Sequence, residues 1–224
     1  MNAIPGKIFW TVTCIITISA VLFLIQSAYR RYKFSSEISR KIAHITVGLV
    51  SLIFIRLIDD IYIIGMISLG TFVLLLLTKM KDGLESIHKT ERKSIGSVVY
   101  PLPIFICYAV ALRENSQLYL YLPLLTFILA DPAAASVGLS LGWKPYRIWN
   151  EKRTISGSMA FFISTVLISL VVVNIHAGAG FLDRFWILLL IALPATLIES
   201  VSPRGSDNLT VPLAQLILIR LVLI

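Results

Sequence analysis

Asp131 is the most unusual ionisable residue of this 224-residue chain, because it lies deep within a long apolar segment. Pro132 follows it directly, and a run of small residues then continues to Gly142. A carboxylate at such depth is costly in a membrane and marks a functional site by default. Proline removes a backbone donor and can break a helix, which would expose carbonyl groups to a cavity. The alternative is a structural role, in which Asp131 only caps a broken half-helix.

Two further carboxylates, Glu199 and Asp207, are predicted at the same membrane face, and Asn208 follows Asp207 directly. Mg²⁺ takes oxygen ligands and needs few protein groups when substrate phosphates share the site. We therefore predict Asp131, Glu199 and Asp207 as metal ligands, with Asp131 and Asp207 also acting in catalysis. For Asp207 and Asn208 the structural alternative is an ordinary helix N-cap, where both residue types are common.

Four predicted spans begin on one membrane face with polar, cationic or small residues. A helix N-terminus offers unpaired N–H groups to a phosphate, glycine permits close approach, and Lys or Arg adds charge-assisted hydrogen bonds. Each end taken alone also fits an ordinary cap beside a cationic loop. The predicted phosphate- or nucleotide-binding residues are Arg40, Lys41, Gly96, Ser97, Lys152, Arg153, Thr154, Gly157, Ser158 and Asn208.

His44 is the third candidate catalytic residue, because it lies near the predicted cytoplasmic end of a span, four residues after Arg40. Such a histidine could serve as a general base or donate a hydrogen bond to a phosphate. The alternative is an interfacial histidine without a chemical role.

The elements that position these residues are membrane helices. The chain is 57% hydrophobic and 14% charged, with a mean hydropathy of +0.87, whereas a soluble domain is about 45–50% apolar and about a quarter charged. The hydrophobic core of one soluble domain of this size cannot bury the additional apolar residues. The composition excludes a secreted, disordered or nucleic-acid-binding soluble protein. It predicts an all-α transmembrane bundle that forms a single integral membrane domain over residues 1–224, with Cys14 and Cys107 as small core residues.

About eight segments are long and apolar enough to be spans. Fifteen of the twenty Lys and Arg residues fall in the alternate loops 29–41, 79–94, 143–157 and 199–208. The positive-inside rule makes these loops cytoplasmic and both termini non-cytoplasmic. The short chain, without a transit peptide, favours a bacterial plasma membrane. The predicted spans are Ile8–Ala28, Ile42–Ile58, Ile61–Thr78, Ile95–Leu112, Leu118–Gly142, Ser158–Val173, Phe185–Ile198 and Leu209–Ile224.

Four motifs follow one another along the chain from residue 38 onward. They are Arg40-Lys41-x-x-His44, the segment from Ala130 to Gly138 with Gly142 beyond, Lys152-Arg153-Thr154-x-x-Gly157-Ser158, and Glu199 followed by Asp207-Asn208-x-Thr210-x-Pro212. On these motifs the chain resembles the CTP-dependent lipid-alcohol kinases, which include phytol kinase, dolichol kinase and a CTP-using diacylglycerol kinase. The resemblance implies Mg²⁺-dependent phosphoryl transfer from CTP to the hydroxyl of an isoprenoid alcohol or of diacylglycerol. In related sequences a glutamate often precedes the Gly-Ser pair, but Ser156 stands there in this chain, so no carboxylate role is carried over.

Two other functions compete with a kinase. Phosphatidate cytidylyltransferase is also a membrane enzyme that uses CTP, but its usual C-terminal signature of Lys-Asp and His-Gly-Gly before Asp-Arg-x-Asp is absent from this sequence. A small transporter would use Asp131 as a coupling carboxylate. A conduction path should place ionisable groups along its whole length, whereas those of this chain gather on one face.

Overall fold

The computed structural model describes residues 4–33, 35–81, 84–88, 94–149, 151–177, 185–203 and 205–223. Their contacts group the chain into two compact units, which we call unit 1 (Met1–Phe105) and unit 2 (Ile106–Ile224). The single membrane domain expected from the sequence stays a prediction. Four basic residues of the predicted cytoplasmic loops lie outside the described residues, namely Lys89, Arg92, Lys93 and Arg204.

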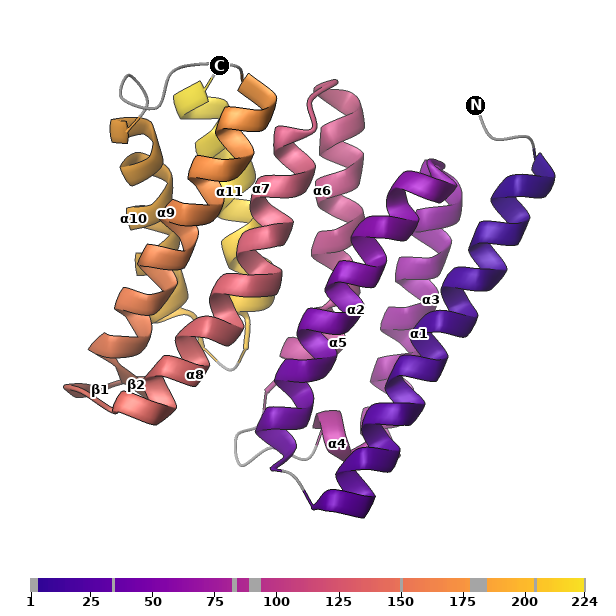
Figure 1. The fold of residues 1–224 in the computed structure, drawn as a ribbon, viewed down its shortest axis with the longest axis horizontal. Helices are drawn as coiled ribbons and strands as arrows, with labels where there is room; N and C mark the ends of the chain where they lie inside the picture. Colours follow the sequence, from indigo (N-terminus) through magenta and orange to yellow (C-terminus); the bar gives the residue numbers. More distant parts are fainter. Residues whose placement is uncertain are drawn as a thin grey trace. The chain divides into compact units, whose positions relative to one another are not determined.

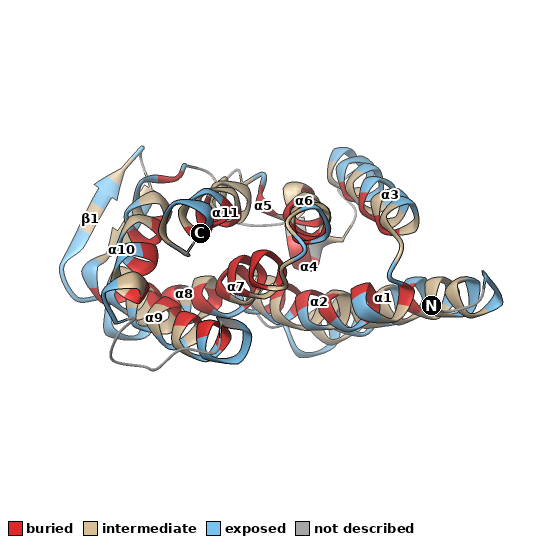
Figure 2. Cartoon of the chain, turned by 90° about the horizontal axis from the view of Figure 1, so that it is seen from above, coloured by how far each residue is buried: buried red, intermediate tan, exposed pale blue. Residues whose placement is uncertain are grey.

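The predicted all-α membrane fold is confirmed. Within the described ranges, six helices are long and apolar enough to cross a membrane. They coincide with the first six predicted spans; at the seventh lies a shorter apolar helix, Phe185–Val201, and at the eighth a helix over Asp207–Leu223. Cys14 and Cys107 are both buried free thiols, as expected. Figure 2 shows exposed residues along much of the first helix, as expected for a surface that faces lipid.

Unit 1 is a helical bundle (Figure 1). It contains α1 (Ile4–Tyr32), α2 (Ser36–Ile58), α3 (Ile61–Met80), α4 (Glu85–His88), α5 (Gly96–Val99) and the first residues of α6 (Pro101–Arg113). Local sequence sets the turns between its long helices. The Ser35 hydroxyl accepts a hydrogen bond from the Ile38 N–H and so caps α2. Asp59 ends α2 in a left-handed conformation with φ of 45°, and the Asp60 carboxylate caps α3 by accepting from the N–H groups of Tyr62 and Ile63.

Unit 2 joins helices to one two-stranded antiparallel hairpin. The hairpin lies at one end of the unit, beside the start of α9 (Figure 1). Sequence reasoning treated residues 143–157 as a loop, so it missed this hairpin. The elements are α7 (Leu118–Leu125), the π-helix η1 (Thr126–Ala130), α8 (Asp131–Leu141), β1 (Pro145–Ile148), β2 (Glu151–Thr154), α9 (Ile155–Ala177), α10 (Phe185–Val201) and α11 (Asp207–Leu223).

The helix break that a proline can cause does not occur at Pro132. The chain stays helical from Leu118 to Leu141, and a π-helical turn over Thr126–Ala130 immediately precedes Asp131 and Pro132. A proline ring clashes with the carbonyl four residues earlier in a regular α-helix. The wider π turn lies at this point of the helix, and such turns are frequent at functional sites. Asp131 therefore begins α8 within a continuous span.

Two glycines allow α8 and α9 to pack closely. A Cβ atom on Gly157 would lie 3.0 Å from the carbonyl oxygen of Ala134 and 3.5 Å from the Cα of Gly138. On Gly138 it would lie 2.9 Å from the Thr154 hydroxyl oxygen. Small residues bring membrane helices close together in this way. The packing fixes the start of α9, and thus β2, against α8.

Candidate active site at the hairpin end of unit 2

Arg153 is the centre of a buried ionic cluster in unit 2. Its guanidinium donates hydrogen bonds to Glu199 Oε1, to the Ser202 carbonyl oxygen at 2.7 Å and to Asp207 Oδ2 at 3.3 Å. A fourth group, Glu151 Oε2, lies 3.9 Å from the same guanidinium. Only 13% of the Arg153 side chain is exposed. The planar fork of arginine suits this arrangement, since it can direct N–H groups to several oxygen atoms at once.

Three elements bring these charged groups together. Arg153 and Glu151 come from β2, Glu199 from the last turns of α10, and Asp207 from the first turn of α11. A second contact ties the hairpin to α10, because the Trp149 indole N–H donates to the Val201 carbonyl oxygen at 3.0 Å. The hairpin thereby holds the end of α10 close to the start of α11.

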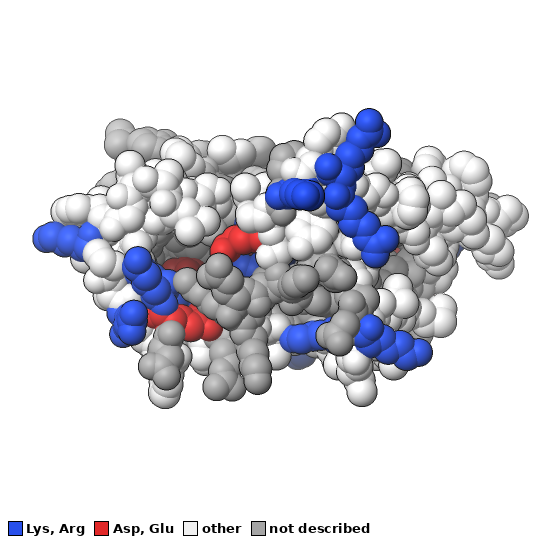
Figure 3. Space-filling model, turned by 90° about the horizontal axis from the view of Figure 1, so that it is seen from below, with Lys and Arg blue, Asp and Glu red and all other residues white. Residues whose placement is uncertain are grey.

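Asp131 lies within electrostatic reach of this cluster. It is half-buried at the start of α8, and its negative charge acts on the Glu199 carboxyl. The three carboxylates that the sequence predicted as a set therefore gather in one region of unit 2. Figure 3 shows acidic side chains beside basic ones on the face that carries the hairpin.

The charges around Arg153 fix its protonation. Burial lowers the pKa of its guanidinium, but the negative charges of Glu199 and Asp207 outweigh this effect and hold the pKa above its ordinary value. Arg153 is thus a permanent cation whose described contacts are to protein groups. Its predicted contact with nucleotide phosphates stays a prediction.

The other residues of this motif serve local structure. The Thr154 hydroxyl accepts hydrogen bonds from the Gly157 N–H at 3.1 Å and from the Ser156 hydroxyl at 3.2 Å, so it caps α9. Ser158 shares a 2.8 Å hydrogen bond with the Tyr146 hydroxyl of β1. Gly157 packs against α8, and its predicted approach to a phosphate stays a prediction. Lys152 is exposed beside them.

The start of α11 is held by its own side chains. Asp207 Oδ1 accepts a hydrogen bond from the Asn208 N–H at 2.9 Å. The Thr210 hydroxyl shares a 2.8 Å hydrogen bond with the Ser202 hydroxyl, which joins α11 to the residue after α10. Asp207 therefore accepts a backbone hydrogen bond in the first turn of α11 and pairs with Arg153 at the same time.

The remaining candidates lie in unit 1. His44 is buried in α2, its ring meets the Tyr100 ring edge to face at 4.8 Å, and its carbonyl oxygen accepts a 2.5 Å hydrogen bond from the Tyr100 hydroxyl. Arg40 lies 3.8 Å from Glu37. Gly96 donates its N–H to the Ser94 hydroxyl, and α5 is only four residues long. Lys41 and Ser97 lie on α2 and α5, and their predicted roles toward phosphate stay predictions.

The carboxylates Asp131, Glu199 and Asp207 are ligands of the type that Mg²⁺ prefers, but they are not arranged around a common metal position. Across the part of the chain that the structure describes, no group of three or more His, Cys, Asp or Glu side chains is arranged to hold a metal ion. Arg153 lies between Glu199 and Asp207 and neutralises part of their charge. Magnesium, however, is commonly bound by one or two carboxylates together with substrate phosphates. Asp131 and Asp207 meet that smaller requirement by residue type.

Sequence reasoning missed three contributors to this cluster. Glu151, Trp149 and Ser202 each contact the hairpin or its Arg153, yet none belongs to a motif that we singled out for chemistry. The available signal was position: Glu151 lies two residues before Arg153, where a strand places both side chains on one face.

Comparison with curated proteins gives three similar sequences, all named phytol kinases. A "probable phytol kinase 2, chloroplastic" of Oryza sativa subsp. japonica is 28% identical over an alignment of 225 positions. The alignment covers 91% of this chain and 72% of that protein. The phytol kinase of a Synechocystis strain is 27% identical over 186 residues, covering 80% and 76%. A "probable phytol kinase 3, chloroplastic" of Glycine max is 25% identical, covering 90% and 68%.

No protein-family model and no solved structure matches the chain. The similarity to the phytol kinases nevertheless extends over most of its length. It agrees with the order of motifs along the sequence and with the multi-pass helical fold. The chain is therefore a relative of proteins named phytol kinase, which confirms the predicted resemblance to the lipid-alcohol kinases.

Proposed function

We propose that this protein is a membrane kinase that transfers a phosphoryl group from CTP to the hydroxyl of an isoprenoid alcohol. One observation carries the proposal. Three motifs far apart in the sequence, around Asp131, Arg153 and Glu199–Asp207, come together at the hairpin end of unit 2. The names of the similar proteins favour an isoprenoid alcohol such as phytol over diacylglycerol as the acceptor.

Phosphoryl transfer asks the protein mainly for positioning and for stabilisation of negative charge. In the proposal Asp131 and Asp207 hold Mg²⁺ through their carboxylate oxygens, and the metal would neutralise charge on the nucleotide phosphates when bound. Arg153 holds Glu199 and Asp207 in place and limits the repulsion between the carboxylates. Exposed Lys152, next to Arg153 in the hairpin, is the candidate for direct contact with phosphate oxygens. Asp131 and His44 are the candidates for accepting the proton of the alcohol.

The proposal places this site on the cytoplasmic face, with both termini on the other side. It is supported by the concentration of Lys and Arg in the alternate loops. Single cysteines at position 152 in the hairpin and at position 59 between α2 and α3, in a variant lacking Cys14 and Cys107, would test it in intact cells. We expect a membrane-impermeant thiol reagent to label position 59 and to leave position 152 unlabelled. The opposite pattern would overturn the orientation.

The chemistry is tested with purified protein, Mg²⁺ and CTP that is labelled separately at its α and γ phosphates. The acceptors are phytol, a longer polyprenol, diacylglycerol and phosphatidate. We expect γ label to appear in the isoprenoid alcohols and no α label in any lipid. Transfer of α label to phosphatidate would establish a cytidylyltransferase instead. Transfer of neither label to any acceptor would contradict enzymatic use of CTP and favour the transporter alternative.

A further inference from the structure

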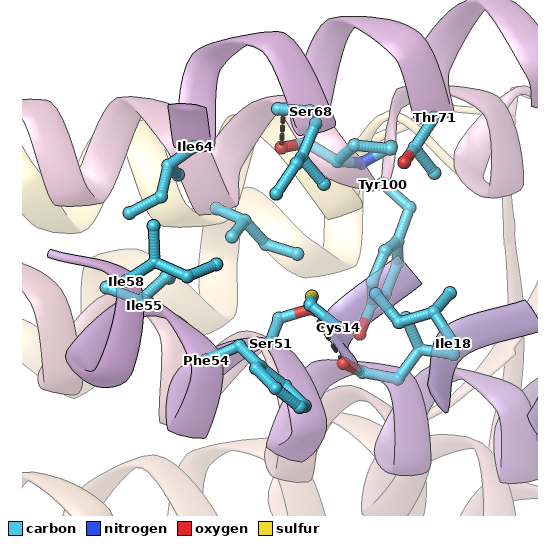
Figure 4. Close-up of a pocket in the computed structure, with 14 residues that line it drawn as sticks. Cys14, Ile18, Ser51, Phe54, Ile55, Ile58, Ile64, Ser68, Thr71 and Tyr100 are labelled. Atoms are coloured by element: carbon cyan, nitrogen blue, oxygen red, sulfur yellow. Dashed lines mark hydrogen bonds between the residues drawn. The ribbon is translucent and has the colours of Figure 1, made fainter. Parts of the chain in front are cut away.

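Unit 1 contains a cavity that is lined by none of the residues of the ionic cluster at the hairpin. It lies among α1, α2, α3 and the start of α6, and Figure 4 shows the side chains that line it. The cavity has a volume of about 50 Å³, while a single water needs about 10–15 Å³ by this measure. It therefore has room for several carbon-sized groups.

Most of the polar atoms in the lining are already bonded to protein. The Ser51 hydroxyl donates to the Val47 carbonyl oxygen at 2.8 Å, and the Ser68 hydroxyl donates to the Pro101 carbonyl oxygen at 2.6 Å. The Tyr100 hydroxyl donates to the carbonyl oxygen of His44. The rest of the lining is largely aliphatic. Such walls offer a ligand packing contacts and few hydrogen bonds, so they suit a hydrocarbon chain.

The two ends of the cavity differ in polarity. Ile55, Ile58 and Ile64 form one end, while Thr71 and Tyr100 lie toward the other (Figure 4). Among the residues that the structure describes, the Thr71 hydroxyl has no hydrogen-bond partner. One end can therefore pack against carbon alone, and the other can also accept or donate one hydrogen bond. This gradient matches a molecule with a hydrocarbon tail and a single hydroxyl group.

We propose that this cavity binds the lipid alcohol, with a segment of its tail against Ile55, Ile58 and Ile64 and its hydroxyl end toward Thr71 and Tyr100. The proposal rests on the proposed function, because that function supplies the isoprenoid alcohol as the ligand. Tyr100 joins this end of the cavity to His44, which belongs to one of the motifs shared with the kinase family.

Selection of the alcohol from the bilayer cannot depend on the hydrophobic effect, because lipid tails are as apolar as the cavity walls. It depends on close packing against the branched Ile side chains and on the hydrogen bond at Thr71. A straight acyl chain of a membrane lipid lacks both the methyl branches and the hydroxyl group. The cavity should therefore prefer a branched alcohol to the surrounding lipid.

Photo-crosslinking tests the binding mode without using enzymatic activity. Two phytol analogues carry a diazirine, one on the tail segment that the cavity would hold and one beside the hydroxyl-bearing carbon, and the full-length protein is in nanodiscs. We expect the tail probe to label the peptides around Ile58 and Ile64 and the head probe to label those around Thr71 and Tyr100. Excess unlabelled phytol should compete, and phytane, which lacks the hydroxyl, should compete less.

Two substitutions on one helix provide a matched test. Ser51→Phe places a ring in the cavity, whereas Ile53→Phe places the same ring at an exposed position of α2. Overfilling the cavity should lower crosslinking and raise the KM for phytol at least about fivefold, with the KM for CTP unchanged. Ile53→Phe should change neither. Thr71→Val keeps the shape and removes the hydroxyl, so it should raise the phytol KM about threefold.

The outcomes separate this inference from the proposed function. Specific crosslinking in a protein that phosphorylates no alcohol would support the cavity and contradict the kinase. Kinase activity with equal labelling of wild type, Ser51→Phe and Ile53→Phe would overturn the cavity and leave the kinase. Labelling that phytane and phytol reduce equally would also overturn it, because the cavity would then hold any hydrocarbon chain. If Ser51→Phe does not fold, the probe positions and Thr71→Val still decide the question.

Discussion

The two units each contain an interaction between a basic and an acidic side chain from distant parts of the chain, but in different surroundings. In unit 1 Lys7 Nζ lies 2.8 Å from Asp60 Oδ2, and these side chains are 27% and 23% exposed. In unit 2 Arg153 contacts Glu151, Glu199 and Asp207, whose side chains are between 8% and 13% exposed. The first is a pair and the second is a network.

The difference predicts opposite consequences of mutation. An exposed ion pair gains little energy, since water and salt screen it. A buried network cannot lose one member without leaving an uncompensated charge behind, and this is strongly destabilising. Such a network is poor evidence of stability in itself, because apolar residues often pack as well. Its retention at the end of unit 2, beside Asp131, therefore argues for a chemical role.

The largest effect is expected for Asp131→Asn. The asparagine keeps the shape and an oxygen donor but removes the charge proposed to hold Mg²⁺. Loss of a main electrostatic contact commonly lowers kcat by about 10²–10³-fold. We expect a decrease of this size, measured as γ-phosphoryl transfer, with normal expression and a monodisperse elution profile in detergent. Near-normal turnover would remove Asp131 from the active site, because a purely structural carboxylate tolerates this change.

Arg153→Ala should break the network. Glu199 and Asp207 would lose the cation that compensates their buried carboxylates, and removing one member of such an arrangement costs about 3–5 kcal/mol. Thermal unfolding in detergent should therefore shift to a clearly lower temperature than in wild type. Lys152→Ala alters the exposed neighbouring residue and serves as the control. Adding Glu199→Gln to Arg153→Ala should restore part of the loss, and equal unfolding temperatures in the two single variants would contradict a buried network.

Gly157→Ala tests the packing that positions β2. The new Cβ would lie 3.0 Å from the Ala134 carbonyl oxygen, and overpacking of this kind costs about 1–3 kcal/mol. We expect a moderate loss of thermal stability and of kcat, because α9 must move away from α8. Gly70→Ala in α3 meets no atom within 4 Å and is the matched control. If both variants unfold at the same temperature, the close contact of α8 and α9 does not contribute to the stability of the fold.

The smallest effect is expected at the half-buried Lys7–Asp60 pair of unit 1. The hydrogen bond from Lys7 lowers the pKa of the Asp60 carboxyl, and its bonds from the N–H groups of Ile63 and Tyr62 act in the same direction. A lowered pKa contributes stability above the unfolded value, about 3.9, and this contribution is lost as pH falls through the folded value. Asp60→Asn should thus unfold slightly below wild type near pH 7, with the difference vanishing in acid. A difference that grows in acid would contradict this assignment.

The membrane helices could be predicted from the sequence, because they depend on local composition. Asp131 could be singled out for the same reason, since it lies within an apolar segment. Long apolar segments and a charged residue within one of them are visible without knowledge of the fold. The partners of Arg153 were not predictable, since Glu199 and Asp207 lie 46 and 54 residues away along the chain. Only the packing of α10 and α11 beside the hairpin brings them together.

The structure also adds details that the local sequence does not contain. Proline can break a helix, but a π-helical turn precedes Pro132 and the span stays continuous. Gly157 is predicted to approach a phosphate because glycine permits close approach, and in the structure it packs against the neighbouring helix. A glycine in a sequence indicates close contact without revealing the partner. The hairpin was missed because its strands are four residues each and carry no continuous apolar pattern.

The central claim is that the carboxylates at the hairpin end of unit 2 carry the phosphoryl-transfer chemistry. The most direct test compares Asp207→Asn with Asp60→Asn, since both carboxylates accept a backbone hydrogen bond at the start of a helix and pair with a cation. The measurement is the rate of γ-phosphoryl transfer from CTP to phytol at saturating substrates, normalised to folded protein. We predict a loss of about 10²-fold or more for Asp207→Asn and a wild-type rate for Asp60→Asn. Equal rates in the two variants would contradict the claim.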